Sequence, residues 1–237
     1  LEEDPQIKVI GYAREGREAL KKIERLNPDL ITLDVEMPGL DGLATLEALM
    51  DKNPMPVVML SSTTTAGAKT TIRALELGAV DFVPKPSKRE DLMLLGGELT
   101  EKVKLAAKVS IESIKKQRER CDGKPCEPVP LIEAQPLPVK VPRVKKQIDL
   151  VAIGTSTGGP AALTEVFKSL PKNLAAGIVI AQHMPPGFTS SLASRLNDLG
   201  NMPVKEAENG DILVKGRAYL APAGFQTEVE KIRGEIR

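Results

Sequence analysis

The chain has 237 residues, of which 41% are hydrophobic and 27% charged, and its net charge is +1. This length and composition exclude the disordered class and allow one large or two ordinary domains with a buried core. Aromatic residues make up only 3% and Trp is absent. That composition argues against a nucleic-acid surface that stacks bases on exposed rings.

The charge is unevenly distributed along the chain. Residues 1–87 hold 10 basic and 14 acidic side chains, residues 88–148 hold 14 and 9, and residues 149–237 hold 9 and 9. The basic excess of the middle segment contains no aromatic residue. A solvated linker surface therefore explains it better than a nucleic-acid site.

The first 87 residues alternate between strand-like and helix-like segments. Short runs rich in Val, Ile and Leu are typical of buried parallel strands, and they cover 7–13, 29–34, 56–62 and 79–85. Between them, apolar residues recur at helical spacing over 15–26, 41–53 and 66–78. Strands that alternate with helices predict a doubly wound parallel α/β sheet.

The middle of the chain changes character twice. Residues 88–120 are helical in pattern and charged, whereas 121–147 contain six prolines, which favour an extended, semi-rigid linker. A ligand for a proline-binding domain is the alternative. Cys121 and Cys126 are too few for a disulfide framework and lack two further zinc ligands, so they are interpreted as reduced thiols.

A second α/β pattern starts at Ile148. Its predicted strands are 148–154, 176–182 and 217–223, and its predicted helices are 160–170 and 187–199. The expected organisation is thus a domain over 1–87, a helical and then Pro-rich linker over 88–147, and a domain over 148–237. No signal peptide or run of 18 apolar residues is visible, so we expect a cytoplasmic protein without membrane insertion.

Polar side chains that suit phosphoryl chemistry close three of the predicted strands. They are Asp34, the pair Ser61 and Ser62, and Lys85. In an open α/β sheet, ligands bind beyond the carboxyl ends of the strands. A carboxylate there can attack phosphorus, while a hydroxyl and an ammonium bind the phosphoryl oxygens. The alternative is a helix-capping Asp34 and a surface Lys85.

The run "DLITLDVEMPGLDGL…MPVVMLSS…ALELGAVDFVPKP" resembles a response-regulator receiver domain, which has the flavodoxin-like fold. The resemblance implies that Asp34 is the phosphoacceptor and that Ser61 is the switch hydroxyl. It also implies that Phe82 is the rotating aromatic residue and that Lys85 pairs with the phosphoryl group. The Lys85–Pro86 peptide bond is expected to be cis, which a proline tolerates.

The same resemblance implies Mg²⁺ as the cofactor of phosphorylation, held by Asp34 and by the backbone carbonyl of Glu36. Receivers also take metal ligands from an acidic pair after their first strand, and neither this strand nor the pair is found in the sequence. In the order 2-1-3-4-5 that strand lies between the second and the third. We therefore expect that an N-terminal piece of the natural protein is missing here.

A serine lies in a turn of small residues in the second domain. The segment 154–158 fits the pattern G-x-S-x-G, with Ser156 exposed between a strand and a helix, whereas no Lys follows Gly159 as a P-loop requires. His183, the one histidine of the chain, follows the next strand and is expected at the same sheet edge. The imidazole could take the serine proton, and the Thr157 N–H could hold an oxyanion. The alternative is a glycine-rich turn capped by Ser156 and a structural histidine.

The segments "IGTSTGGPAAL", "IVIAQHMPPGFTSSLASRLN", "VKEAENGD" and "AYLAPAG" resemble the catalytic domain of the chemotaxis protein-glutamate methylesterase family, CheB. The resemblance implies that Ser156 is the nucleophile and His183 the general base, with no cofactor for ester hydrolysis. The family's third triad member is an aspartate near its C-terminus. Asp211, the last aspartate here, precedes the strand 217–223 and does not match it, so the C-terminal part of this domain is expected to be missing.

By this resemblance, the protein hydrolyses glutamate methyl esters on chemoreceptors and deamidates certain receptor glutamines. The kinase CheA would phosphorylate Asp34, and the unphosphorylated receiver would cover the Ser156 cleft. The rival hypothesis is a phosphorylation-gated binding module without catalysis, although such a module needs neither Ser156 nor His183. A DNA-binding regulator is disfavoured, because residues 149–237 are neutral and have no basic stripe.

Overall fold

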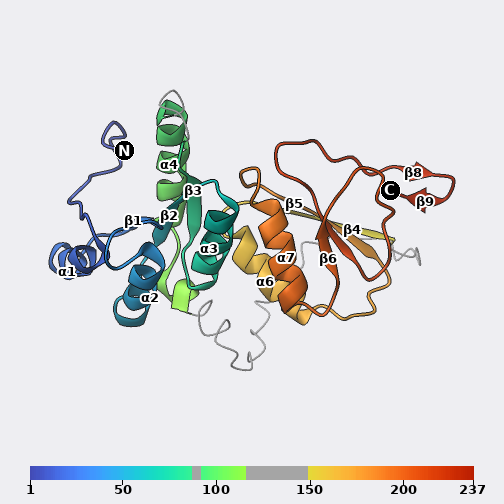
Figure 1. The fold of residues 1–237 in the computed structure, drawn as a ribbon, viewed down its shortest axis with the longest axis horizontal. Coiled ribbons are helices and arrows are strands. Elements are labelled where there is room, and N and C mark those ends of the chain that lie inside the picture. The colour runs from blue at the N-terminus through green and yellow to red at the C-terminus, as the bar shows by residue number, and fades with distance from the viewer. Residues whose placement is uncertain (87–91, 116–148) are drawn as a thin grey trace, which may run out of the picture.

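The computed structural model describes residues 1–86, 92–115 and 149–237, which form two α/β units (Figure 1). The predicted Pro-rich linker, with Cys121 and Cys126, lies outside these residues. Within the described part of the chain, no helix combines the length and the apolar character needed to cross a bilayer.

The first unit is built on a parallel sheet with the order β1-β2-β3. Its strands are β1 (Ile31–Asp34), β2 (Val57–Ser61) and β3 (Asp81–Pro84). Its helices are α1 (Gly16–Leu26), α2 (Gly42–Lys52), α3 (Thr65–Glu76) and α4 (Leu92–Ala106). The apolar run of β2 is almost entirely buried, as a strand covered on both faces requires. The three strand predictions in this part of the sequence are confirmed.

Residues 7–13 form no strand, so this prediction is wrong. A strand needs a neighbour for its backbone hydrogen bonds, and β1 pairs only with β2 in the part of the chain that the structure describes. Val9, Ile10 and Tyr12 are consequently exposed, Tyr12 to 76%.

Helix α4, which the sequence places in the linking segment, packs against β3 and β2 of the first sheet. Its side chains Val103 and Ala106 are buried, as is Ile114 in the short helical segment 111–115 that follows. These apolar residues need a surface to cover, and the sheet supplies it. The packing extends the first unit beyond the predicted end at residue 87, while the division of the chain into functional domains stays a prediction.

The second unit is a parallel sheet with the order β4-β5-β7-β6. Its strands are β4 (Leu150–Thr155), β5 (Gly177–Gln182), β6 (Val204–Glu206) and β7 (Ala218–Leu220), and its helices are α6 (Gly159–Ser169) and α7 (Thr189–Leu199). An antiparallel hairpin of β8 (Lys231–Ile232) and β9 (Glu235–Ile236) follows. The strands β6, β8 and β9 were not predicted, because each is only two or three residues long and, unlike the equally short β7, includes charged residues that interrupt an apolar run.

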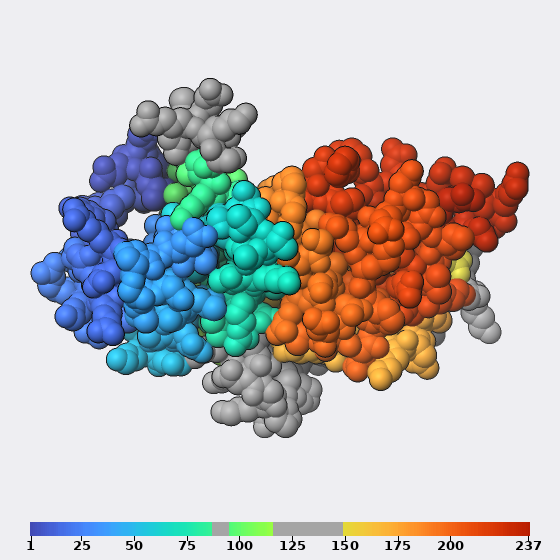
Figure 2. All heavy atoms as spheres, viewed as in Figure 1, coloured from blue at the N-terminus to red at the C-terminus, as the bar shows by residue number. Residues whose placement is uncertain are grey.

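The two units touch through α3, which lies against α6 and α7 (Figure 1). In the space-filling view, the atoms of α3 and α7 meet along a continuous surface (Figure 2). Glu76 at the end of α3 is only 6% exposed and forms a two-pronged ion pair with Arg195 of α7. The rings of Phe82 and Phe188 lie 4.6 Å apart, centroid to centroid, across the same boundary. The boundary is therefore both apolar and charge-paired.

Candidate active site and phosphorylation site

The pairing of β4 with β5 brings Ser156 and His183 together. The parallel register runs to Thr155 opposite Gln182, and the His183 N–H donates to the Thr155 carbonyl at 2.9 Å. The next residue on β4's side is Ser156, whose Oγ lies 3.3 Å from His183 Nδ1. Both side chains are exposed to solvent. A serine and an imidazole at this separation can form a nucleophile–base pair, and such contacts are often long before substrate binds.

The turn after Ser156 leaves a backbone donor free. Gly158 has φ +76°, a left-handed conformation that favours glycine, and it caps the N-terminus of α6. Among the described residues, the Thr157 N–H has no hydrogen-bond acceptor. A free N–H at a helix N-terminus can bind an oxyanion.

A carboxylate partner for His183 is not found among the described residues, where its second ring nitrogen makes no hydrogen bond. Asp211 is engaged elsewhere: its carboxylate accepts from the Glu208 N–H at 2.8 Å and pairs with Lys205 at 3.0 Å. Desolvation raises the pKa of Asp211, but these two contacts outweigh it, so that the pKa lies below its usual range. Asp211 is thus a structural anion.

At the carboxyl edge of the first sheet, Lys85 Nζ lies 2.7 Å from Asp34 Oδ1 and 4.0 Å from Glu36 Oε2. The Glu36 N–H also donates to Asp34 Oδ1, at 2.8 Å. Oδ2 of Asp34 has no hydrogen-bond or ion-pair partner in the described residues. A carboxylate that attacks phosphorus needs such a free oxygen. The arrangement can hold a phosphoryl group between Asp34 and the Lys85 ammonium.

The two serines at the end of β2 make different contacts. Ser61 is fully buried and faces α3, where its hydroxyl accepts from Thr71 at 2.6 Å and donates to the Gly67 carbonyl at 3.3 Å. Ser62 instead donates to Glu36 at 2.9 Å. The structure therefore connects Ser62 with the acidic edge and gives Ser61 no contact with Asp34. The sequence placed both serines at this strand end but could not tell which one faces the carboxylates.

Phe82 lies at the boundary between the units and is 2% exposed. The neighbouring Asp81 accepts a hydrogen bond from the Thr157 hydroxyl at 2.5 Å, so a carboxylate of the first unit holds the residue next to Ser156. Lys102 of α4 lies 3.4 Å from Asp81 and donates to the Phe82 carbonyl at 2.7 Å. Asp81 and Lys102 belong to no motif, and the sequence analysis missed them.

The sequence also predicts a cis Lys85–Pro86 peptide bond and a Mg²⁺ site in the first unit. The described residues contain no cis peptide bond, so the expectation for Lys85–Pro86 is wrong; the trans form is the intrinsically favoured one. For Mg²⁺, the described residues contain no cluster of three or more His, Cys, Asp or Glu side chains that is arranged to hold a metal ion. The Asp34 carboxylate and the Glu36 carbonyl do not make a Mg²⁺ site by themselves, because Mg²⁺ requires six oxygen ligands in octahedral geometry.

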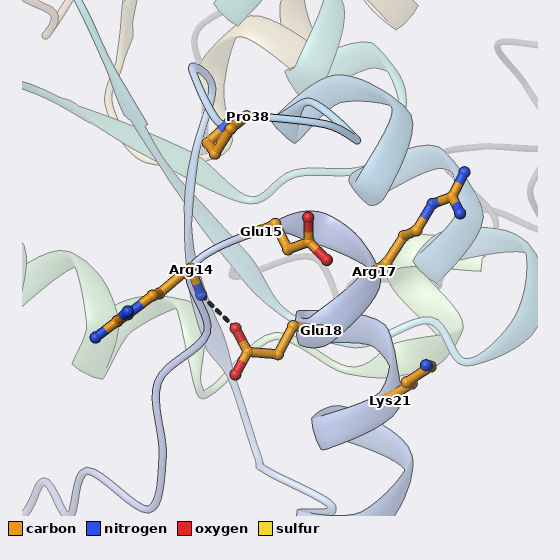
Figure 3. Close-up of a pocket in the computed structure, with 6 residues that line it drawn as sticks. All are labelled: Arg14, Glu15, Arg17, Glu18, Lys21 and Pro38. Atoms are coloured by element: carbon orange, nitrogen blue, oxygen red, sulfur yellow. Dashed lines mark hydrogen bonds between the residues drawn. The ribbon is translucent and has the colours of Figure 1, made fainter.

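A surface hollow of about 510 Å³ lies between α1 and the loop after β1 (Figure 3). Its lining comprises Arg14, Glu15, Arg17, Glu18, Lys21 and Pro38. The Arg14 N–H donates to Glu18 at 2.8 Å, which ties the start of α1 to its own first turn. None of the predicted site residues lines the hollow.

Two family models match the chain, one on each unit. The model described as CheB methylesterase matches residues 151–237, and the model described as response regulator receiver domain matches residues 1–95. The order of the two matches is the order of the two units in the structure.

Several curated relatives match almost the whole chain. A protein of Moorella thermoacetica named protein-glutamate methylesterase/protein-glutamine glutaminase is 43% identical, over 98% of this chain and 69% of its own length. Proteins of the same name from Oceanobacillus iheyensis and Halalkalibacterium halodurans are each 47% identical, over 98% and 100% of this chain and 64% of their own length. The chain thus spans about two thirds of the length of these relatives. Because the family models match both units in this order and these relatives match almost the whole chain, the chain belongs to the CheB methylesterase family.

Proposed function

We propose that the protein is a phosphorylation-regulated chemoreceptor methylesterase that also deamidates receptor glutamines. The observation that carries this proposal is the 3.3 Å contact between Ser156 Oγ and His183 Nδ1 at the carboxyl edge of the second sheet. The names of the relatives, which specify glutamate methyl esters and glutamine amides, supply the substrate class. The methyl-accepting receptors are then the protein partner, and the cytoplasm is the place of action.

In the proposed reaction, Ser156 Oγ attacks the ester carbonyl carbon while His183 accepts its proton. The carbonyl oxygen becomes an oxyanion, which the free Thr157 N–H stabilises. His183 then returns the proton to the methoxy oxygen, methanol leaves, and an acyl-serine ester remains. Water, deprotonated by His183, hydrolyses this ester and restores Ser156. With glutamine as substrate, ammonia leaves in place of methanol.

The proposed control begins at Asp34, which accepts a phosphoryl group from the kinase CheA and binds it together with Lys85. Phe82 and Asp81 lie on β3, the strand that ends next to Lys85. Ser61, the switch hydroxyl of the proposal, would have to leave its buried contact with Thr71 to reach the phosphoryl group. Such a movement would change the packing of α3, the helix that contacts the catalytic unit.

The contacts between the units support a form of gating in which the receiver lies beside the Ser156–His183 pair without covering it. Asp81 and Phe82 border the site at Thr157 and Phe188, yet Ser156 and His183 remain exposed. A small ester can therefore reach the serine past the receiver, whereas a receptor helix, which is about 10 Å wide, needs the space beside it. We propose that phosphorylation shifts the population towards an arrangement in which the receiver has left this flank.

The test is methanol release from methylated chemoreceptor by the full-length natural protein, with and without acetyl phosphate, in wild type and in Asp34→Asn. Acetyl phosphate should stimulate methanol release by the wild type. In Asp34→Asn, the ratio of methanol release with acetyl phosphate to release without it should be about 1, because an amide cannot accept the phosphoryl group. Stimulation that persists in Asp34→Asn would refute Asp34 as phosphoacceptor. Absence of release under every condition would favour the non-catalytic binding module.

Replacing Glu76 with Gln should raise the unphosphorylated activity on receptor about tenfold, equivalent to about 1.4 kcal/mol of lost interface free energy. The change removes the charge that faces Arg195, and charge-assisted hydrogen bonds are the stronger ones. Arg195 is 36% exposed and can regain water, which keeps the effect moderate.

The readout for Glu76→Gln is methanol release without acetyl phosphate, beside hydrolysis of a small methyl ester. The small ester should react at the wild-type rate, because Ser156 is already exposed. Glu47→Gln, an exposed change on α2 away from the boundary, is the matched control. Equal stimulation of both substrates would contradict gating by access.

A further inference from the structure

A buried glutamine lies directly beneath the reactive pair. Gln182 is the last residue of β5 and is only 8% exposed, whereas the side chains of Ser156 and His183 are exposed. Burying a side-chain amide is unfavourable unless its polar atoms find partners. The position of this amide therefore depends on the contacts that it makes.

The amide of Gln182 is held by three hydrogen bonds. Its Nε2 donates to the carbonyl of Ser156 at 2.9 Å and to the carbonyl of His183 at 3.0 Å. Its Oε1 accepts from the hydroxyl of Thr155 at 2.7 Å. The reversed orientation would turn Oε1 towards two carbonyl oxygens, so the network admits one orientation. A buried network in which every member is satisfied is rigid.

The backbone alone leaves the serine less well fixed than the histidine. His183 is anchored by the hydrogen bond of its N–H to Thr155, the end of the ladder between β4 and β5. Ser156 lies beyond that ladder, and its carbonyl accepts from the Gly159 N–H at 2.7 Å within its own turn. Among the side chains that the structure describes, Gln182 alone bridges the carbonyls of Ser156 and His183.

The start of α6 leaves room for this amide. A Cβ atom on Gly159 would lie 2.0 Å from Gln182 Oε1 and 2.8 Å from the Thr155 Cβ. A residue other than glycine at position 159 would thus require the Gln182 amide and the Thr155 side chain to shift. The glycine of the serine turn and the glutamine of the neighbouring strand fit one another.

We propose that Gln182 is the positioning residue of the esterase site, which fixes the distance between Ser156 and His183 by holding both backbone carbonyls. This inference rests on the proposed serine-esterase function. Gln182 touches no reacting atom and acts through the two residues that do. Because a misplacement of about 1 Å between reacting groups can lower the rate about 10²-fold, losing the bridge should slow acylation strongly.

The experiment replaces Gln182 with Met, which keeps the volume and removes all three hydrogen bonds. In the full-length protein we expect kcat for methyl ester hydrolysis, per serine titrated with a fluorophosphonate, to fall about 10²-fold. The KM should change less than threefold, because the substrate-binding surface is untouched. The rate constant of labelling by the fluorophosphonate should fall in parallel, since it depends on the same proton transfer.

A purely structural role would give a different pattern. Thr164→Val removes another buried hydrogen bond, from the Thr164 hydroxyl to the Pro160 carbonyl on α6, away from the pair. It should lower the Tm as Gln182→Met does and leave kcat per titrated serine unchanged. Unchanged kcat per titrated serine in Gln182→Met would overturn the proposal.

Gly159→Ala tests the same amide from the other side and carries the proposal if Gln182→Met does not fold. It should lower kcat per titrated serine at least tenfold with Gln182 still present, and a wild-type value would overturn the proposal. Wild type and Ser156→Ala are measured first. If wild type hydrolyses no ester, the proposed function has failed; if it does and the variants match it, the positioning role alone has failed.

Discussion

Ser156→Ala should lower kcat for ester hydrolysis by at least about 10⁴-fold, because no other group at the site can form the acyl intermediate. The residual rate would come from the free Thr157 N–H, which can still polarise the ester carbonyl. Methanol release from methylated receptor, followed over hours, gives the needed range. The acyl adduct on Ser156, which mass spectrometry should detect in the wild type, should be absent from Ser156→Ala.

Ser169→Ala is the matched control for this experiment. Ser169 is an exposed serine at the end of α6, and its hydroxyl donates to the Glu165 carbonyl. The Ser169→Ala variant should hydrolyse the ester at the wild-type rate. Turnover by Ser156→Ala within tenfold of wild type would mean that the nucleophile is another group.

His183→Gln should lower kcat about 10³-fold, within the range expected for removal of a general base. Glutamine keeps a polar side chain at the position but cannot accept the serine proton. The double variant with Ser156→Ala should be no slower than Ser156→Ala alone, because residues that act as a unit have non-additive effects.

This comparison is made with the small methyl ester, so that the state of the receiver does not enter. If the two losses multiplied in the double variant, Ser156 and His183 would act independently, and the 3.3 Å contact would have no catalytic meaning.

The two strand-end clusters could be predicted from the sequence because each depends on local features. An apolar run fixes a parallel strand, and the residue after it is then placed at the carboxyl edge. Asp34 and Lys85 are thereby placed at the edge of one sheet, and Ser156 and His183 at the edge of the other, by the sequence alone.

The contacts across the boundary could not be predicted in this way. Asp81 meets Thr157 across 76 positions of sequence, and Glu76 meets Arg195 across 119. These pairs depend on how the two folded units pack, which no periodicity or motif records.

The strand predicted for residues 7–13 is absent for a related reason. Their apolar character suits a strand, but strand formation also requires a hydrogen-bonding neighbour, and composition does not reveal whether one is present.

Strand β3 is only four residues long and faces both sites at once. Lys85 follows its last residue and contacts Asp34, the proposed phosphoacceptor, while Asp81 and Phe82 at its beginning contact the catalytic unit. At about 3.3 Å per residue, only roughly 10–13 Å separates Lys85, beside the proposed phosphorylation site, from Asp81 and Phe82, which contact the catalytic unit. A chimera that takes this strand together with α3 from a different receiver should therefore change how strongly acetyl phosphate stimulates methanol release from methylated receptor, whereas exchange of α1 or α2 should leave that stimulation unchanged.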